Sequence, residues 1–364
     1  MINFVELKRT YDLYACEYEE AVLKAMRSGW YIMGKELSEF ERQFASYVGS
    51  KYCIGINSGL DALILAVRAL GIKAGDEVIV PSNTYIASVL GITENGATPV
   101  FVEPDEYFGI DAEKIESAIT EKTKAILPVH LYGQACDMTK ICSIAGKHNL
   151  MVIEDCAQSH GATYCGKMTG TFGDIGCFSF YPTKPLGALG DSGAIVTDDE
   201  KIAKKLFAMR NYGSSKKYVN NIVGVNSRLD ELQAAALQVS LKHVDDGVDY
   251  RNRIARRYLT EIKNTSVILP KCNPNSRHVY HVFALLSNKR NELQKHLFDC
   301  GISSLIHYPI PPHLQKCYTY LGYHQGDLPI CEKYASCELS LPIYNGMPHE
   351  EVSLVINAVN SFKG

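Results

Sequence analysis

Lys184 stands where a lysine side chain would be kept from water. It lies in FSFYPTKPLGALGDSG, between an aromatic-rich run and a glycine-rich loop. Most lysines are solvated surface charges. Apolar and glycine flanks remove hydration from an ammonium group, and lost hydration lowers its pKa. Because such a lysine is the nucleophile that forms Schiff bases with carbonyl compounds, Lys184 is a candidate catalytic residue.

Asp155 closes a second apolar run, LMVIEDC. A carboxylate there is costly to bury unless it meets a cation or a proton donor. In open parallel sheets, ligands bind beyond the carboxyl ends of the strands, which is where Asp155 would lie. A helix N-cap or a structural ion pair is an alternative role for this residue.

A third feature is the turn in IGINSGLDALILA, where Ser58, Gly59 and Leu60 join a strand-like run to a helical one. Free backbone N–H groups at a helix N-terminus form a ready phosphate site. Ser and Gly before a helix are also ordinary capping residues, so the turn alone does not establish a site.

These features become specific when they are combined with Tyr85 in PSNTYIAS. Pyridoxal phosphate requires a phosphate cradle, a carboxylate against its pyridinium nitrogen, a lysine for the imine and an aromatic over its ring. The chain supplies one of each at predicted strand ends. Their order is that expected of an aspartate-aminotransferase-like domain.

The elements that must position these residues follow from hydrophobic patterning. Apolar runs alternate with helical patterns, such as 60–70 and 138–149, which is typical of a mostly parallel sheet in an α/β domain. The apolar runs are 51–56, 77–81, 98–103, 124–132, 150–156, 175–182 and 193–197.

A long helical region around 228–263 precedes a change of pattern. Strands are expected at 278–286 and near 339–344, with a helix at 291–301. We therefore predict three parts: a helical segment 1–48 packed on the core, a large α/β domain 49–248 and a smaller α+β domain 249–364.

Composition narrows the class of protein further. The 364 residues carry a net charge of −3, so no basic excess exists to neutralise nucleic-acid phosphates. No apolar run is long enough for a membrane span, and the amphipathic N-terminus lacks a secretory h-region. Twelve cysteines include no C-x-x-C pair. We expect a cytoplasmic protein with reduced thiols, no structural metal, no nucleic-acid partner and no membrane partner.

Eight segments spread over the whole chain resemble one family. They are SGWYIMGKELSEFE, NSGLDAL, VPSNTYIAS, PVHLYGQACDM, VIEDCAQSHGA, GCFSFYPTKPLGALGDSGA, NSRLDELQAA and IHYPIPPHLQ. Together they are similar to the DegT/DnrJ/EryC1/StrS sugar-nucleotide aminotransferases. The resemblance implies the aspartate-aminotransferase-like fold (fold type I) and pyridoxal 5′-phosphate as cofactor.

The resemblance also implies roles for cofactor-binding residues. Lys184 matches the lysine that forms the imine, and Asp155 matches the acid that pairs with the pyridinium nitrogen. Gln158 matches the residue beside the phenolic oxygen of the ring. Tyr85 matches the aromatic that stacks on the ring. Phosphate-binding positions are matched by Ser58, Gly59, Leu60 and Ser179.

Asn226, in VNSRLDE, matches an asparagine that family members reach across to the partner subunit's cofactor. The resemblance thus implies a homodimer with shared active sites, although helix capping is an alternative role for Asn226. Tyr181, His307, Tyr308 and His313 are candidates for the sugar and diphosphate pocket. Loop packing in the proline-rich segment HYPIPPH is the alternative for the last three.

The implied reaction moves an amino group from L-glutamate to a nucleotide-sugar ketone by a ping-pong Schiff-base mechanism. YPTKPLGALGD is more similar to the branch acting on the C3 ketone of dTDP-3-keto-6-deoxyhexoses than to the C4 branch. A C4 aminotransferase acting on a nucleotide-linked 4-keto-6-deoxyhexose stays open. Pro185 departs from the asparagine that many members carry after the lysine, which bears on the substrate.

Other classes fit less well. The loop Gly187–Gly193 is not the G-x-G-x-x-G of nicotinamide dehydrogenases, and no G-x-S-x-G elbow of a serine hydrolase occurs. A non-catalytic ligand sensor on the same fold would lose the lysine, whereas this chain keeps Lys184, Asp155 and Gln158.

Overall fold

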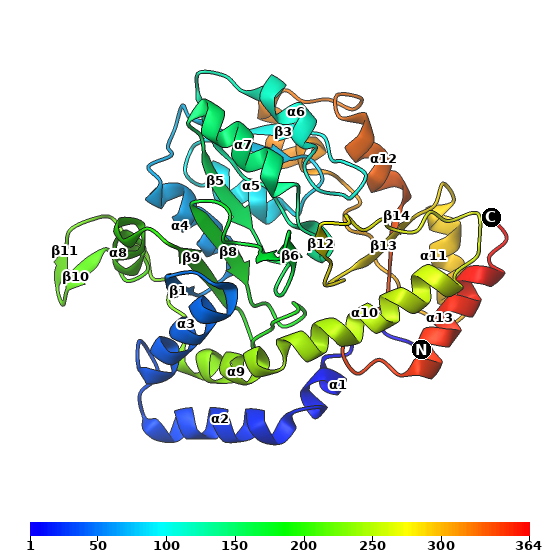
Figure 1. Cartoon of the computed structure of the whole chain (residues 1–364), viewed down its shortest axis with the longest axis horizontal. Helices are drawn as coiled ribbons and strands as arrows, with labels where there is room; N and C mark the ends of the chain where they lie inside the picture. The colour runs from blue at the N-terminus through cyan, green and yellow to red at the C-terminus, as the bar shows by residue number, and fades with distance from the viewer.

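Seven strands form the central sheet of the computed structural model, which describes residues 1–364 (Figure 1). In chain order they are β1 (Tyr52–Ile56), β2 (Glu77–Pro81), β3 (Thr98–Val102), β4 (Thr123–Ile126), β5 (Met151–Asp155), β8 (Ile175–Ser179) and β9 (Gly193–Thr197). Their order across the sheet is β1-β9-β8-β5-β4-β2-β3. Neighbours from β8 to β3 are parallel, and β9 is antiparallel to both β1 and β8. The predicted α/β class with a mostly parallel sheet is confirmed.

Both faces of this sheet are covered, which explains why its strands read as continuous apolar runs. In β2, Val78 and Val80 face a cluster shared with α4 (Gly59–Ala69), α5 (Ile86–Thr93) and α8 (Glu200–Met209). Ile79 faces the opposite cluster, shared with α6 (Ala112–Ile115) and α7 (Met138–His148). Successive residues of a strand point to opposite faces of the sheet. Because helices cover both faces, all three side chains are fully buried.

An aromatic cluster fixes the chain segment that leads to Lys184. Phe40 and Phe44 of α3 (Lys35–Val48) are fully buried. The ring of Phe44 meets Phe178 of β8 edge-on at 5.0 Å and Phe180 at 5.2 Å. Phe40 meets Phe180 at 5.4 Å. Edge-to-face pairs of this kind add specific geometry to the burial, so α3 anchors the end of β8.

The C-terminal part contains a separate two-stranded sheet. Strands β13 (Phe283–Leu286) and β14 (Glu338–Leu341) are antiparallel. They share a core with α10 (Val244–Glu261), α11 (Arg290–Asp299) and α13 (His349–Ser361). In Figure 1, α10 continues the line of α9 (Glu231–Lys242) toward this part. Helix α10 runs across position 248. The domain boundaries at 48 and 248 stay predictions.

The remaining elements are short or lie at the edges of the molecule. They are α1 (Leu7–Asp12), α2 (Ala15–Ser28), α12 (Pro329–Cys337), four 3-10 turns (Glu116–Ala118, Leu131–Gly133, Pro312–Leu314 and Lys316–Leu321), β6 (Thr163–Tyr164), β7 (Lys167–Met168), β12 (Ser276–Arg277), β10 (Ser214–Lys216) and β11 (Val219–Asn220). The β10–β11 hairpin projects from the body at the left of Figure 1. At the chain start, Ile2 pairs in parallel with Ile302 and joins the C-terminal core.

Two predicted strands of the C-terminal part are shorter than expected. The strand at 278–286 begins only at Phe283, because Tyr280 has a positive φ of 46° and its ring stacks on His278 at 3.9 Å. The strand near 339–344 spans Glu338–Leu341, and Pro342, which has no N–H to extend the ladder, follows it.

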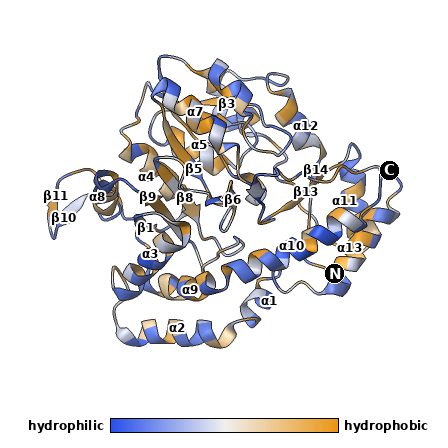
Figure 2. Cartoon of the chain, viewed as in Figure 1, coloured by the Kyte–Doolittle hydropathy of each residue, from blue (hydrophilic) through white to orange (hydrophobic).

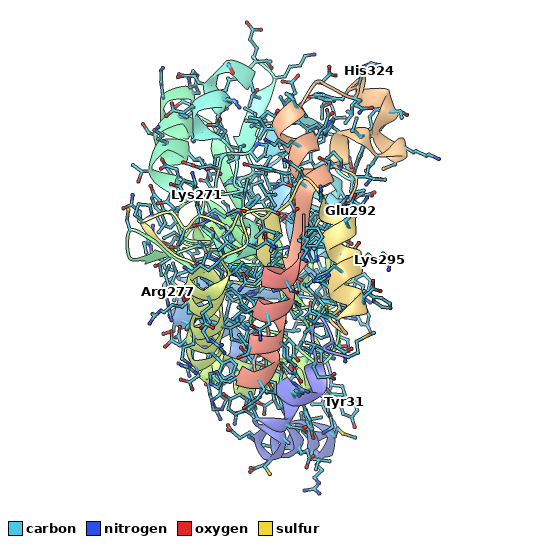
Figure 3. The ribbon with its side chains drawn as sticks, turned by 90° about the vertical axis from the view of Figure 1, so that its right-hand side faces the viewer. Tyr31, Lys271, Arg277, Glu292, Lys295 and His324 are labelled. Carbon is cyan, nitrogen blue, oxygen red and sulfur yellow. The ribbon has the colours of Figure 1, made fainter.

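Surface and interior separate as the hydropathy pattern predicts. Figure 2 shows hydrophobic central strands, and helices such as α10 with one hydrophobic and one hydrophilic side. The view in Figure 3 labels side chains at the surface: Tyr31, Lys271, Arg277, Glu292, Lys295 and His324. None of the helices combines the length and apolar character needed to cross a membrane.

Candidate active site

Lys184 lies in the loop after β8, where its backbone N–H donates to Tyr181 O at 2.8 Å. Its side chain contributes to the wall of a cavity of about 530 Å³. Burial lowers the pKa of Lys184 to about 8, and the nearby negative charge of Asp155 opposes this shift. About a tenth of Lys184 is therefore a neutral, nucleophilic amine at pH 7, far more than for a lysine with the ordinary pKa.

Asp155 is the last residue of β5 and is almost fully buried. Its Oδ2 accepts a hydrogen bond from Ser88 Oγ at 2.7 Å, and its Oδ1 accepts one from Ala157 N at 3.1 Å. Burial raises the pKa of Asp155, while these hydrogen bonds and the charge of Lys184 counteract the rise. The carboxylate is thus stabilised on both oxygens at the carboxyl end of the sheet.

Gln158 joins the segment after β5 to a loop of the C-terminal part. Its Oε1 accepts from Tyr132 N at 2.6 Å, and its Nε2 donates to Tyr308 Oη at 3.2 Å. Tyr308 in turn lies 5.3 Å from the ring of Tyr85, between centroids. Three residues that the sequence analysis singled out therefore form one connected group.

The predicted phosphate turn closes against the end of β8. Ser58 is the N-cap of α4, and its Oγ accepts from Asp61 N at 3.1 Å. A Cβ at Gly59 would lie 2.5 Å from the Cβ of Ser179, so no side chain fits at position 59. The N–H groups of Gly59 and Leu60 have no acceptor within the helix, because they belong to its first turn. The turn, α4 and Ser179 thus form a cradle built largely from backbone.

These residues fit pyridoxal phosphate. The cradle at Gly59 matches a phosphate, the buried Asp155 matches a protonated ring nitrogen, and Lys184 has the lowered pKa of an imine-forming lysine. All three follow strands whose carboxyl ends lie at one edge of the sheet, since β1, β5 and β8 point the same way. The structure thus gathers the predicted cofactor residues of this chain at one place.

Three of the predicted residues are exposed in the single chain. Tyr85 is 54% exposed, Tyr181 is 51% exposed, and Asn226 is exposed beside the hairpin. The hydroxyl of Ser227 accepts from Asn57 N at 3.3 Å, which places the Asn226 segment beside the phosphate turn of its own chain. A role for Asn226 in a partner's site stays a prediction.

The two predicted histidines lie in different places. His307 contributes to the cavity wall with Lys184. Its backbone N–H donates to Glu338 Oε2 at 2.6 Å, and its ring Nδ1 lies 2.8 Å from Ser340 Oγ. His313 is almost fully buried beside Glu332, 3.3 Å away, and does not contribute to that wall. The structure thus brings His307 to the cavity and leaves His313 in packing between loops.

Sequence reasoning missed several residues of this site. Ser88 carries a hydroxyl group within the otherwise apolar helical run IASVLGIT. A polar side chain in such a run is the signal that could have pointed to its contact with Asp155. Arg251 and His281 contribute to the cavity wall but lie in segments for which the sequence predicted only a helix and a strand. The N-terminal residues Phe4 to Tyr18 supply much of the same wall, and no motif marks them.

A buried hydrogen-bonded pair, His130 and Glu154, supports the strand end that carries Asp155. Glu154 accepts from the backbone N–H groups of Gly170, Phe172 and Gly173 at 2.7–2.8 Å. His130 Nδ1 accepts from Cys136 N, so its Nε2 carries the proton and donates to Glu154 at 3.0 Å. These two side chains and Cys156 also form a group of potential metal ligands. Hydrogen bonds within the chain account for both side chains, and the expectation of no metal stays a prediction.

Comparisons with known proteins identify the family of this chain. The model of the DegT/DnrJ/EryC1/StrS aminotransferase family matches residues 14–360. The chain is 54% identical, over 100% of its length and 99% of the relative's, to dTDP-3-amino-3,6-dideoxy-alpha-D-galactopyranose transaminase of Aneurinibacillus thermoaerophilus. It is 44% identical to dTDP-3-amino-3,4,6-trideoxy-alpha-D-glucose transaminase of Streptomyces venezuelae, over 99% and 96% of the two chains.

Solved structures of other proteins have the same fold as this chain. The crystal structure of DesV from S. venezuelae has a TM-score of 0.97 and 44% identity, and the match covers 99% of this chain and 97% of that one. NtdA from Bacillus subtilis, solved with the bound cofactor PMP, has a TM-score of 0.90 and 33% identity, over 98% and 83% of the two chains. The predicted fold type I is thereby confirmed. The chain belongs to the DegT/DnrJ/EryC1/StrS aminotransferase family and is a pyridoxal-phosphate-dependent sugar-nucleotide aminotransferase.

Proposed function

We propose that this enzyme transfers the amino group of L-glutamate to the C3 ketone of a dTDP-linked 3-keto-6-deoxyhexose, in two half-reactions of a ping-pong cycle. The observation that carries the proposal is the buried Lys184–Asp155 pair, in which each charge shifts the pKa of the other. A cation-forming amine and a carboxylate held apart from water are the groups that amino transfer requires.

Four groups of this chain would hold the cofactor. Ser58, Gly59, Leu60 and Ser179 would bind its phosphate, and Asp155 would keep its ring nitrogen protonated. Tyr85 would cover one face of the ring, and Gln158 would contact its phenolic oxygen. Asn226 would reach the cofactor of the partner subunit. When bound, pyridoxal phosphate supplies the electron sink for the carbanion that forms on the amino donor.

Lys184 would act as the acid–base group of both half-reactions. With its pKa lowered to about 8, its neutral Nζ can remove the proton from the donor carbon that carries the amine, and can return a proton later. The neighbouring imidazole of His307 is kept neutral, because burial and the charge of Lys184 lower its pKa to about 4. His307 would therefore offer hydrogen bonds to the sugar rather than charge.

The substrate assignment rests on the relatives and on the cavity. Both relatives named above form 3-amino sugars attached to dTDP. A cavity of about 530 Å³ is within the range of small-molecule sites. Tyr181, His307 and Tyr308 would contact the sugar and diphosphate. Of these candidates only His307 lines this cavity, so Tyr181 and Tyr308 would contact the substrate from beside it. For the buried His313 we propose contact with the substrate only through movement of its loop.

We further propose a homodimer as the active form. Tyr85, Tyr181 and Tyr212 are large aromatics left more than half exposed beside the site and the hairpin. Large apolar side chains left exposed are what a second molecule would cover. A second copy of this chain would cover them and complete the site with its own Asn226.

Incubation of the purified enzyme with pyridoxal phosphate, L-glutamate and separate ketosugars tests the substrate. We expect 2-oxoglutarate and an amino sugar with dTDP-3-keto-6-deoxyhexoses of galacto and gluco configuration, faster with galacto because of the 54% identical relative. Parallel lines in double-reciprocal plots would support the ping-pong cycle. A parallel incubation uses dTDP-4-keto-6-deoxyglucose.

Conversion of the 4-keto compound alone would replace the C3 assignment by the C4 alternative and leave the reaction class intact. A protein without a visible cofactor band, even after addition of pyridoxal phosphate, would instead be a ligand sensor on this fold.

A further inference from the structure

The cavity beside Lys184 is lined by three cations, of which Lys8 pairs with Asp12 and Lys184 is influenced by Asp155, whereas Arg251 has no carboxylate partner. Its wall includes Lys8, Lys184 and Arg251, together with three histidines. No Asp or Glu contributes to that wall. Cations that face one cavity attract an anion into it, because the low-dielectric walls strengthen the field there.

Arg251 is the least exposed of these cations. It lies on α10, and 5% of its surface is exposed. Its Nε donates to Val279 O at 3.1 Å, and its Nη1 donates to Asn345 Oδ1 at 3.1 Å. Its Nη2 has no hydrogen-bond partner, and burial and Tyr47, not a carboxylate, act on the pKa of the guanidinium. A buried charge with an unused donor is costly unless a ligand pairs with it.

The groups around Arg251 make this region electropositive. Burial lowers the pKa of Arg251 to about 10, so the guanidinium stays charged at neutral pH. The pKa values of His160 and His281 are lowered by burial and by the charges of both Lys184 and Arg251. Both imidazoles are therefore neutral and close to the two cations. The ring of His281 makes no hydrogen bond within the chain, although it contributes to the cavity wall.

The position of Arg251 selects among anions. An amino donor must bring its amine to Lys184, and its α-carboxylate is bonded to the carbon that carries that amine. A small carboxylate can therefore reach a buried cation that lines the same cavity as Lys184. A nucleotide diphosphate is larger and strongly hydrated. It fits better near the rim, where the side chain of Lys8 is 71% exposed.

We infer that Arg251, with His281 beside it, forms an anion subsite that binds the α-carboxylate of the amino donor. This inference rests on the proposed function, because it takes the donor to be an α-amino acid. The two N–H groups of Nη2 would bind the carboxylate oxygens, and the neutral ring of His281 would donate one further hydrogen bond. The arginine would hold the donor so that its amine and α-hydrogen face Lys184.

The test compares Arg251→Gln with Arg251→Lys and with the control Arg256→Gln, whose side chain is exposed on the same helix. The donor half-reaction is followed by the absorbance of the bound cofactor as L-glutamate is varied. Losing a buried charge partner should raise the apparent Kd for L-glutamate by about 30-fold or more in Arg251→Gln. Arg251→Lys should recover part of this loss, and Arg256→Gln should stay within about twofold of the parent enzyme.

Two donor analogues identify which carboxylate is bound. L-2-Aminobutyrate keeps the α-carboxylate, and 4-aminobutyrate lacks it. Arg251→Gln should weaken the binding of L-glutamate and of L-2-aminobutyrate by similar factors, and should leave the binding of 4-aminobutyrate unchanged. Loss of affinity for 4-aminobutyrate with no change for L-2-aminobutyrate would overturn the inference, because the distal carboxylate would then be the ligand.

The ketosugar half-reaction separates binding from packing. Its KM should be unchanged in Arg251→Gln. A rise in that KM alone would assign Arg251 to the diphosphate, and equal losses in both half-reactions would assign it to packing of α10. Either result overturns the inference.

Calorimetric titration of the loaded enzyme with glutarate gives a readout without turnover. Glutarate should bind the parent enzyme and Arg256→Gln, and should lose measurable binding in Arg251→Gln. If the parent enzyme aminates no ketosugar yet binds glutarate through Arg251, the proposed function fails while the subsite stands. Equal glutarate binding by the parent and Arg251→Gln would disprove the subsite.

Discussion

Ser88 Oγ donates a 2.7 Å hydrogen bond to Oδ2 of Asp155, although 67 residues separate the two in sequence. Thr84 Oγ1 lies 2.8 Å from the same hydroxyl and belongs to the chain just before α5. The first turns of α5 therefore stabilise the ionised form of a carboxylate at the end of β5. This contact lowers the pKa of Asp155 against the effect of burial.

Ser88→Ala should therefore weaken catalysis without removing a catalytic group. The pKa of Asp155 should rise and its hold on a protonated ring nitrogen should weaken. A hydrogen bond to a charged group contributes about 1.5–3 kcal/mol, so kcat/KM should fall by about tenfold or more. Steady-state kinetics and a cofactor titration measure both effects. Thr84→Val, which leaves the Asp155 contact in place, is the matched control and should have the smaller effect.

Lys184→Ala should abolish amino transfer and the visible absorbance of the bound cofactor. In the parent enzyme, the rate of cofactor capture by apoprotein should rise with pH up to about 8 and level off above it, because only the neutral amine reacts. A lysine with the ordinary pKa of about 10.4 would give a rate that is still rising at pH 9.5. Stopped-flow absorbance from pH 6.5 to 9.5 measures the rate, and a flat profile would contradict the prediction.

Gly59→Ala should disrupt the phosphate cradle. The new Cβ would overlap the Cβ of Ser179 at 2.5 Å, and overpacking of this kind typically costs about 1–3 kcal/mol. We expect weaker cofactor binding together with a lower free energy of unfolding. Gly146→Ala is the control, because that exposed helical glycine has free space around its Cβ position. The control should stabilise α7 by about 0.5–1 kcal/mol.

Glu154→Gln should destabilise the fold strongly for an isosteric change. An amide nitrogen cannot accept from the backbone N–H groups that Glu154 binds, and each buried donor left unpaired costs about 1–3 kcal/mol. Denaturant unfolding measures the loss. Glu113→Gln removes only an exposed ion pair with Lys140 and should cost at most about 1 kcal/mol. Equal stabilities for the two variants would show that the buried contacts do not matter.

A mixture of two inactive variants should test the shared site. Lys184→Ala and Asn226→Ala, refolded together, should form hybrid dimers in which one site has both native residues. With random exchange, activity should reach about a quarter of the parent value, since half of the dimers would carry one intact site out of two. Each variant refolded alone is the control. A mixture no more active than the separate variants would place Asn226 outside the partner's site.

Local sequence was sufficient for much of the fold. The runs at 77–81 and 193–197 correspond to β2 and β9 residue for residue, because a strand buried on both faces must be apolar throughout. The turn at Ser58–Leu60 was also readable, since capping and phosphate binding use the same local chemistry. Lys184 was marked by its flanks, which predicted the lowered pKa that burial produces.

Other features depended on contacts between distant segments. The irregular path of 278–282 reflects the stacking of Tyr280 on His278 and the hydrogen bond from Val279 N to Gly133 O. The burial of His313 depends on Glu332 and the aromatic rings around it. Glu332 and these aromatic rings lie far along the chain or outside the segment HYPIPPH, so the local pattern does not indicate them.

The sequence by itself determined the residue types of the chemistry and the strand ends that carry them, because both depend on neighbours in the chain. Only the tertiary structure decided which groups share a cavity. No motif marks Arg251 or His281, yet the fold places them in one cavity wall with Lys184, and no Asp or Glu lines that wall. The physical reason is that charge pairing and desolvation depend on distances in space, and folding sets those distances between segments far apart along the chain.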